Sequence, residues 1–161
     1  MNIYDFAINF ERENREFYEK CAAESASDNL KQVFLDLAEE EKKHEEIVKQ
    51  LKEEKTVDEV EAGILPKAKK AFEKISKELP EGVLPKEQVD VYKQAKDMET
   101  KSYDFYTEKA EESDLPQVKK TFKRLAEEEK KHEKIIENIV EMVNRPNTWL
   151  DDAEWYHLED Y

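Results

Sequence analysis

Apolar residues recur along most of the chain at alternating steps of three and four, which is the period of one face of an α-helix. The pattern predicts four long helices, at about residues 3–26, 27–54, 85–112 and 116–144. Ser27 with Asp28 and Ser113 with Asp114 supply side-chain oxygens that can cap helix starts, and Pro116 falls in a first turn, where its missing N–H is not needed. Four amphipathic helices with short turns inside each pair can bury their apolar stripes by packing as a bundle.

The pattern weakens in the crossover between the second and third helices, residues 55–84, where Pro66 and Pro80 bracket one short amphipathic helix. We expect a single bundle domain over residues 1–146, followed by a tail, residues 147–161, without a long helical period. The tail is expected to pack on the bundle or on a partner subunit through its aromatic residues, Trp149, Trp155, Tyr156 and Tyr161. The crossover is open to two interpretations, a lid or a hinge for helix exchange between subunits.

The chain repeats itself at an offset of 88 residues (125 − 37). The segment 37–45 recurs without change as 125–133. The same offset relates the first helix to the third, because Ala7, Glu11, Phe17 and Tyr18 correspond to Ala95, Glu99, Phe105 and Tyr106. Two helical hairpins of one design, joined by a crossover, predict a bundle with approximate two-fold symmetry.

Composition supports long helices and excludes several classes of function. Charged residues make up 42% of the chain, with only 2 Gly and 5 Pro. The formal charge of −14 argues against nucleic acid or an anionic membrane surface as partner. A single Cys allows no internal disulfide and no sulfur-ligated metal knuckle. With no apolar run of about 20 residues and no signal-peptide pattern at the start, we expect a cytoplasmic protein.

Two ionisable residues, Glu41 and His44, interrupt the apolar stripe of the second helix, and the repeat places Glu129 and His132 at the same points of the fourth. Buried carboxylates are rare unless they are paired or bound to metal, so the pattern indicates a site; the alternative is a polar seam in an ordinary helical bundle. His157 also follows a Glu by three residues but lies in the aperiodic tail, so we do not expect it to be a ligand. Neighbours off the stripe are expected to be solvated charges, namely Glu39, Glu40, Glu127 and Glu128.

The first and third helices contribute Glu11 and Glu99, which flank their apolar stripes. Each lies 30 residues before the Glu of its hairpin partner (41 − 11 and 129 − 99). A short turn near residue 27 would bring Glu11 and Glu41 to the same height, so each hairpin delivers two Glu and one His to one level of the core. Four carboxylates there repel one another unless protonated or bound to cations, and two divalent ions would neutralise them. Oxygen and nitrogen ligands around ions about 3.5–4 Å apart suit iron or manganese.

This arrangement resembles the ferritin-like di-iron carboxylate proteins, and most closely rubrerythrin-type domains, over nearly all of residues 1–144. The resemblance implies an all-α, ferritin-like four-helix bundle that holds two iron ions, with manganese or zinc as possible substitutes. It implies that Tyr18 and Tyr106 hydrogen-bond to ligand carboxylates, with simple core packing as the alternative. The metal ligands that it implies are Glu11, Glu41, His44, Glu99, Glu129 and His132. Bridging and terminal roles are left open between the pair Glu41/Glu129 and the pair Glu11/Glu99.

The sequence departs from the family pattern at two points. Typical rubrerythrins carry an additional Glu one turn after the third-helix ligand, where this chain has Ser102. They also carry a rubredoxin-like domain with four Cys, whereas Cys21 is the only Cys here and is expected to be a small buried hydrophobe. An internal electron relay and a ligand switch at Ser102 are therefore not expected.

Three functions are compatible with these features. The first is an oxidoreductase that reduces peroxide or dioxygen, in oxidative-stress chemistry, with electrons from an external carrier such as a rubredoxin-like protein. The second is a ferroxidase that oxidises iron for storage or buffering. The third is a non-catalytic bundle that metal merely stabilises. We expect a homodimer or a larger homo-oligomer in each case.

Overall fold

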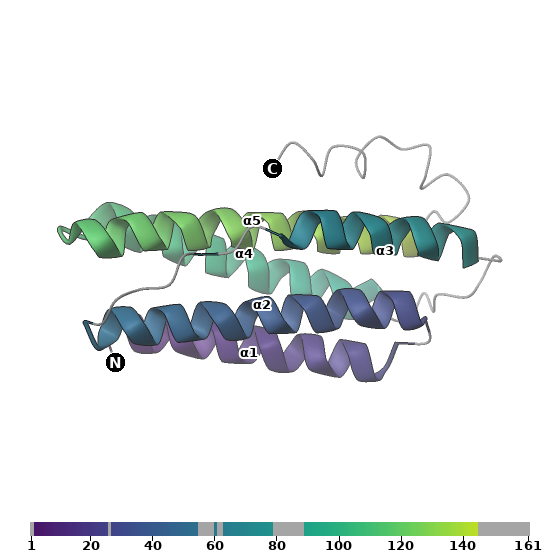
Figure 1. The fold of residues 1–161 in the computed structure, drawn as a ribbon, viewed down its shortest axis with the longest axis horizontal. Coiled ribbons are helices and arrows are strands. Elements are labelled where there is room, and N and C mark those ends of the chain that lie inside the picture. Colours follow the sequence, from purple (N-terminus) through teal and green to yellow (C-terminus); the bar gives the residue numbers. More distant parts are fainter. Residues whose placement is uncertain (1, 26, 55–59, 61–62, 79–88, 145–161) are drawn as a thin grey trace.

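The computed structural model describes residues 2–25, 27–54, 60, 63–78 and 89–144. This part of the chain is helical, without strands (Figure 1). Its helices are α1 (Ile3–Ala23), α2 (Asp28–Lys52), α3 (Ile64–Glu78), α4 (Val89–Glu112) and α5 (Pro116–Asn144). The prediction of an all-α bundle with one short helix in the crossover is confirmed. No helix in the described part is both long and apolar enough to cross a membrane.

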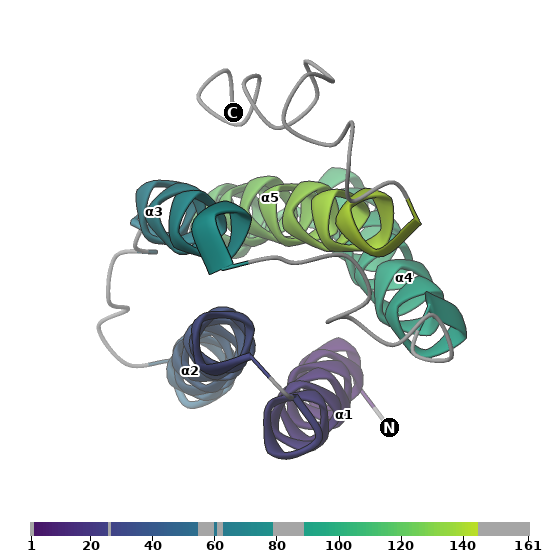
Figure 2. The same cartoon turned by 90° about the vertical axis from the view of Figure 1, so that its right-hand side faces the viewer.

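The four long helices form two antiparallel hairpins that pack against each other. α1 pairs with α2, and α4 pairs with α5, along most of their lengths. Seen end-on, the long helices occupy the corners of a bundle, and α3 lies outside it beside α2 and α5 (Figure 2). This order gives the two-fold arrangement expected from the repeat.

The helix boundaries follow local capping chemistry. Asn2 Oδ1 accepts a hydrogen bond from the backbone N–H of Asp5 at 2.9 Å, and Ser27 Oγ accepts one from Leu30 at 3.2 Å. These contacts satisfy backbone donors that have no partner inside the helix. The cap expected from Ser113 takes a different form, because Ser113 Oγ accepts from the N–H of Leu115, one residue before α5 begins.

The core consists of two apolar clusters, one toward each end of the bundle, and the polar residues of the predicted site lie between them. One cluster joins the start of α2 to the end of α5, and the other joins the end of α2 to the start of α5. Each cluster contains a line of three rings. Tyr18, Phe34 and Tyr92 form one line, and the equivalents Tyr106, Phe122 and Tyr4 form the other.

Two large apolar side chains that follow the helical period are exposed. Phe6 lies in line with the apolar residues of the first helix but is 46% exposed, and Leu115 lies in line with the stripe of the fourth but is 59% exposed. Leu115 precedes α5, so the helical period does not apply to it. The buried face of α1 is centred instead on Ala7, Glu11, Asn14, Tyr18 and Cys21. Small and polar residues dominate that face, and Phe6 lies outside it.

Candidate metal centre

The structure brings all six predicted ligand residues together in the middle of the bundle. Their ligand atoms form two overlapping groups, and within each group all atoms lie within 4.8 Å of one another. The first group is Glu11, Glu41, His44 and Glu129, and the second is Glu41, Glu99, Glu129 and His132. None of the six residues is more than 1% exposed. Glu41 and Glu129 belong to both groups.

The histidines turn their Nδ1 atoms toward the carboxylates of the opposite hairpin. His44 Nδ1 lies 3.0 Å from Glu129 Oε1, and His132 Nδ1 lies 2.7 Å from Glu41 Oε1. The two rings stack at 5.7 Å between centroids with an interplanar angle of 6°. Nδ1 is therefore the ring nitrogen that each histidine offers to the centre of the cluster.

Tyr18 and Tyr106 also reach across from one hairpin to the other. The Tyr18 hydroxyl donates a hydrogen bond to Glu99, and the Tyr106 hydroxyl donates one to Glu11 Oε1 at 2.6 Å. Burial, together with the charges of Glu99 and Glu11 respectively, raises the pKa of each tyrosine well above 10.0. Both hydroxyls therefore stay protonated and act as donors. The prediction that these tyrosines contact the carboxylates is consistent with this geometry.

Crowding of carboxylates shifts their proton affinities in opposite directions. Burial, with the charges of Glu11 and the neighbouring glutamates, raises the pKa of Glu41 and of Glu129 well above 4.5. Burial also acts to raise the pKa of Glu99. Hydrogen bonds from Glu129, His132 and Tyr18 and the charge of His132 outweigh it and lower that pKa to about 2. Without metal, the cluster therefore holds protons on some carboxyl groups and negative charge on another.

The same charges separate the two histidines. Burial lowers the pKa of His44 below 6.5, although the charge of Glu11 acts to raise it. Burial acts in the same direction on His132, but the charge of Glu99 and its hydrogen bond raise the His132 pKa above 6.5. The difference follows from Glu99, whose ionised carboxylate stabilises the imidazolium beside it.

Each member of the cluster retains one polar atom that no protein group satisfies. These buried atoms are Oε2 of Glu11, Glu41, Glu99 and Glu129, and Nε2 of His44 and His132. Buried carboxylate oxygens without a partner are costly in a folded protein, and bound cations would satisfy them. Four carboxylates and two imidazoles fit two divalent ions, whose charge of +4 would balance the −4 of the ionised glutamates.

Three features of the site escaped the sequence interpretation. Asn14 Nδ2 donates to Ser102 Oγ at 3.1 Å, a buried bond between equivalent positions of the two hairpins. Glu40 and Glu128 were expected to be solvated, but they are only 6% and 0% exposed. The exposure expected for Glu39 and Glu127 is confirmed. The signal that could have found Glu40 and Glu128 is their spacing, one helical turn before His44 and His132, which places each beside a ligand.

The remaining predictions concern Cys21, His157 and the aromatic residues of the tail. Cys21 is buried as predicted, and burial, with the charge of Glu24, raises the pKa of its thiol to about 12. A thiol that stays protonated is a poor metal ligand, in agreement with an oxygen and nitrogen site. His157 and the aromatic residues of the tail lie outside the described residues.

A two-hairpin helical bundle with a buried glutamate and histidine cluster at its centre defines a protein of the ferritin-like carboxylate class. The sequence profile of the rubrerythrin family matches residues 2–140 and, in a second match, residues 90–154. The chain therefore belongs to the rubrerythrin family. Comparisons with curated proteins and with solved structures gave no match.

Proposed function

We propose that this protein is a di-iron oxidoreductase that reduces peroxide or dioxygen with electrons from a separate carrier protein. The observation that carries the proposal is the buried cluster, in which two overlapping ligand groups share Glu41 and Glu129. Two adjacent sites that share carboxylates are suited to ions that act as a pair. Residues of all four long helices hold these groups in place, which favours a defined geometry for both ions.

Iron is the metal that this donor set and this chemistry favour. The ligands are carboxylate oxygens and imidazole nitrogens, which suit iron or manganese, and no thiolate is available. A pair of iron ions supplies two electrons, the number that converts hydrogen peroxide and two protons into two water molecules. Glu11, Glu41, Glu99 and Glu129 would hold the ions as shared or terminal carboxylates, and His44 and His132 would each bind one ion through Nδ1.

The residues around the ligands would keep this geometry fixed. Tyr18 donates to one oxygen of Glu99 and Tyr106 to one oxygen of Glu11, and the other oxygen of each carboxylate, Oε2, has no protein partner and would be available to an ion. A carboxylate held at one oxygen by a neutral donor keeps its negative charge available to the metal. The apolar clusters on both sides exclude bulk water and strengthen these interactions.

Under this proposal the electrons come from a separate carrier protein. Cys21 is the only cysteine among these 161 residues, so they contain no four-cysteine rubredoxin-like site. A rubredoxin-like carrier is therefore the proposed electron donor. Assembly of the protein into a homodimer or a larger homo-oligomer remains a prediction.

The test starts with metal content per chain after anaerobic loading with Fe(II). The wild type is compared with the Glu41→Ala/Glu129→Ala variant and with Glu127→Ala, an exposed glutamate on the same helix as Glu129. We expect about two irons per chain in the wild type and the control, and loss of both in the double variant. No iron in any variant, with helicity intact, would rule out the di-iron centre.

Peroxide consumption by the loaded protein, with a reduced rubredoxin-like donor, then separates the oxidoreductase from its alternatives. Turnover that disappears in the double variant supports the proposal. Uptake of many irons per chain in air would indicate a ferroxidase or storage protein. Bound iron that reacts with neither peroxide nor dioxygen would indicate a metal-stabilised bundle without catalysis.

A further inference from the structure

Large apolar residues recur at a spacing of seven on both α1 and α4, at equivalent positions of the 88-residue repeat. The row on α1 is Ile3, Phe10 and Phe17, and the row on α4 is Val91, Met98 and Phe105. Seven residues make about two helical turns, so each row lies along one side of its helix. All six side chains are only partly buried, and Phe6, one turn from Phe10, is 46% exposed. We call these seven residues the α1–α4 face.

Contacts within the chain cover only part of the α1–α4 face. Phe10 packs edge-to-face on Phe105, with 5.3 Å between the ring centroids, so the two rows meet near the middle of the bundle. α1 and α4 contact each other over less of their length than the two helices of either hairpin. α3 lies on the opposite side, against α2 and α5, and none of the described helices lies over α1 and α4 (Figure 2).

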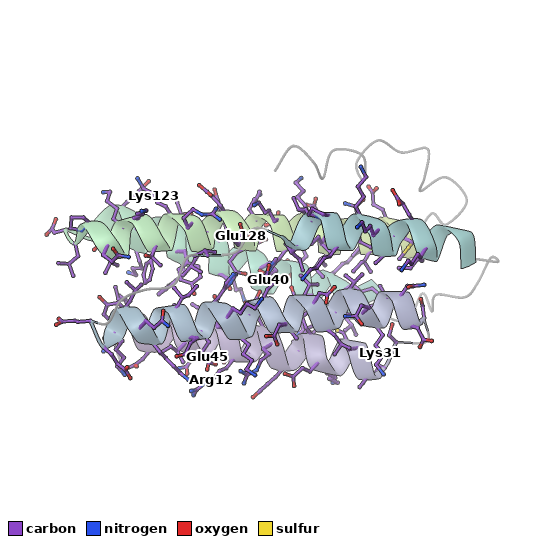
Figure 3. All side chains as sticks on the ribbon, in the orientation of Figure 1. Arg12, Lys31, Glu40, Glu45, Lys123 and Glu128 are labelled. Carbon is purple, nitrogen blue, oxygen red and sulfur yellow. The ribbon has the colours of Figure 1, made fainter. Side chains whose placement is uncertain are left out.

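Other sides of the bundle carry charged residues at this level. Glu40 and Glu128 lie between α2 and α5, and Arg12 pairs with Glu45 on the α1–α2 hairpin (Figure 3). Leu35 on α2 is 40% exposed but belongs to no row of this kind. Single exposed apolar residues are normal on a soluble protein, whereas a continuous row marks a surface that binds a partner.

Two charges of opposite sign lie within the rows of the α1–α4 face. Glu13 and Lys101 are equivalent positions of the repeat, and each follows an aromatic or Met residue of its row by three positions. Both are exposed, and neither makes a hydrogen bond or an ion pair within the described part of the chain. Their neighbours Asn14 and Ser102 are hydrogen-bonded to each other at 3.1 Å, so Glu13 and Lys101 lie at nearly the same height of the bundle.

A second copy of this chain matches both the apolar rows and the charges. A two-fold axis parallel to the helices would lay α1 of one protomer antiparallel on α4 of its partner. Each Glu13 would then lie opposite Lys101 of the partner subunit, and each Phe10 near Phe105 of the partner subunit. A two-fold axis across the helices would instead set Glu13 against its own copy and Lys101 against its own copy, which like charges oppose. In the first arrangement every contact occurs twice.

We propose that the α1–α4 face joins two copies of this chain into a homodimer, with Glu13 of each protomer opposite Lys101 of the partner subunit. The apolar rows would supply buried area, and the charge pairs would fix the relative orientation of the protomers. The inference does not rest on the proposed function, because none of these side chains belongs to the six predicted metal ligands.

Charge reversal tests the arrangement. Lys101→Glu sets like charges opposite each other at both symmetric contacts, and Glu13→Lys does the same with two lysines. The double variant Glu13→Lys/Lys101→Glu restores opposite charges. The dimer Kd is measured by sedimentation equilibrium at low and at high salt, with helicity checked by circular dichroism. We expect each single variant to weaken the dimer by about 10- to 100-fold at low salt and the double variant to return it to the wild-type value. High salt should narrow these differences, because ions screen exposed charges.

The apolar contribution is tested by Phe6→Ser, with Leu35→Ser as the matched control, since Leu35 has similar exposure but lies on α2. Phe6→Ser should weaken the dimer by about 10-fold, because its ring is removed from both halves of the contact, and the control should have no effect. Hydrogen exchange at high and low protein concentration should show protection of α1 and α4 on dimerisation.

A wild type that stays monomeric over the concentration series would overturn the proposal. Protection of α1 and α4 in such a monomer would identify the tail, residues 147–161, as what covers the face. A dimer that neither charge reversal nor Phe6→Ser weakens would also overturn it, because the contact would then lie elsewhere. Iron content keeps the two proposals apart. Monomeric single variants that still bind two irons would leave the metal centre intact, and a wild-type dimer that binds no iron would overturn the proposed function alone.

Discussion

Replacing Glu129 with Gln should stabilise the metal-free protein at neutral pH and weaken its metal binding. In the metal-free cluster, burial and the charges of Glu11 and Glu99 raise the pKa of Glu129 well above 4.5. The folded protein therefore holds a proton that the unfolded chain releases near pH 4.5. Since the folded state binds more protons, the free energy of unfolding is largest below that pH and falls as the pH rises toward the folded-state pKa.

The size of this effect follows from the width of the pH window. Each pH unit over which one carboxyl group stays protonated only in the folded state costs about 1.4 kcal/mol. The total penalty at pH 7 is this amount multiplied by the number of pH units from the ordinary pKa of 4.5 up to the raised folded-state pKa of Glu129, counted no further than pH 7. Gln has nearly the same shape, carries no ionisable group and can still contact His44. The variant should therefore gain up to that amount at pH 7 and nothing near pH 4.

Glu99→Gln is the control, because its expected effect has the opposite sign. The pKa of Glu99 is lowered to about 2, so its ionised form stabilises the fold above pH 4.5, and this stability is lost as the pH falls through about 2. Removing that carboxylate should lower the free energy of unfolding at pH 7 by up to about 3 kcal/mol. Urea unfolding followed by circular dichroism, in a chelator and over a pH series, measures both variants.

Adding metal should reverse the order of wild type and Glu129→Gln. A ligand that binds only the folded state stabilises it according to its affinity, and the wild type keeps the shared carboxylate that the variant lacks. The reasoning is refuted if Glu129→Gln and Glu99→Gln both destabilise the metal-free protein by similar amounts at pH 7. That outcome would indicate a hydrogen-bonded structural network rather than a set of carboxylates that repel one another.

Three further variants test the fold and the surroundings of the cluster. Ser27→Ala removes the cap of α2 and should lower the free energy of unfolding by about 1 kcal/mol in urea titrations. Phe34→Ala leaves a cavity in a fully buried position and should cost about 3–5 kcal/mol in the same assay. Tyr106→Phe removes the hydrogen bond to Glu11 and should reduce zinc affinity by about 10-fold in chelator competition, with little change in helicity.

The sequence predicted the helices and the ligand cluster because both rest on repeated, regular signals. Apolar residues recur every three to four positions in each long helix. The 88-residue repeat makes Glu99 the equivalent of Glu11, and Glu129 the equivalent of Glu41. Equal spacing within each hairpin then brings the carboxylates to one height. Both features follow from the regular geometry of an α-helix, so they can be predicted from the sequence.

The misplaced residues depend on tertiary packing, which periodicity does not contain. Phe6 follows the apolar period of α1, yet the face that meets the other helices is lined by small and polar residues. Glu40 and Glu128 look like parts of a charged run, and only the approach of α2 to α5 buries them. The cross-hairpin hydrogen bond from Tyr18 to Glu99 likewise requires knowing how the two hairpins face each other.

The reciprocal contacts between hairpins connect metal binding to the fold itself. Each ligand group takes three residues from one hairpin and a single glutamate from the other, either Glu129 or Glu41. The hydrogen bonds of Tyr18 and Tyr106 cross in the same way. Neither hairpin alone can therefore complete a group, and the repelling carboxylates oppose their association until cations arrive. Metal should for this reason stabilise the docking of one hairpin on the other more than the helices within each hairpin.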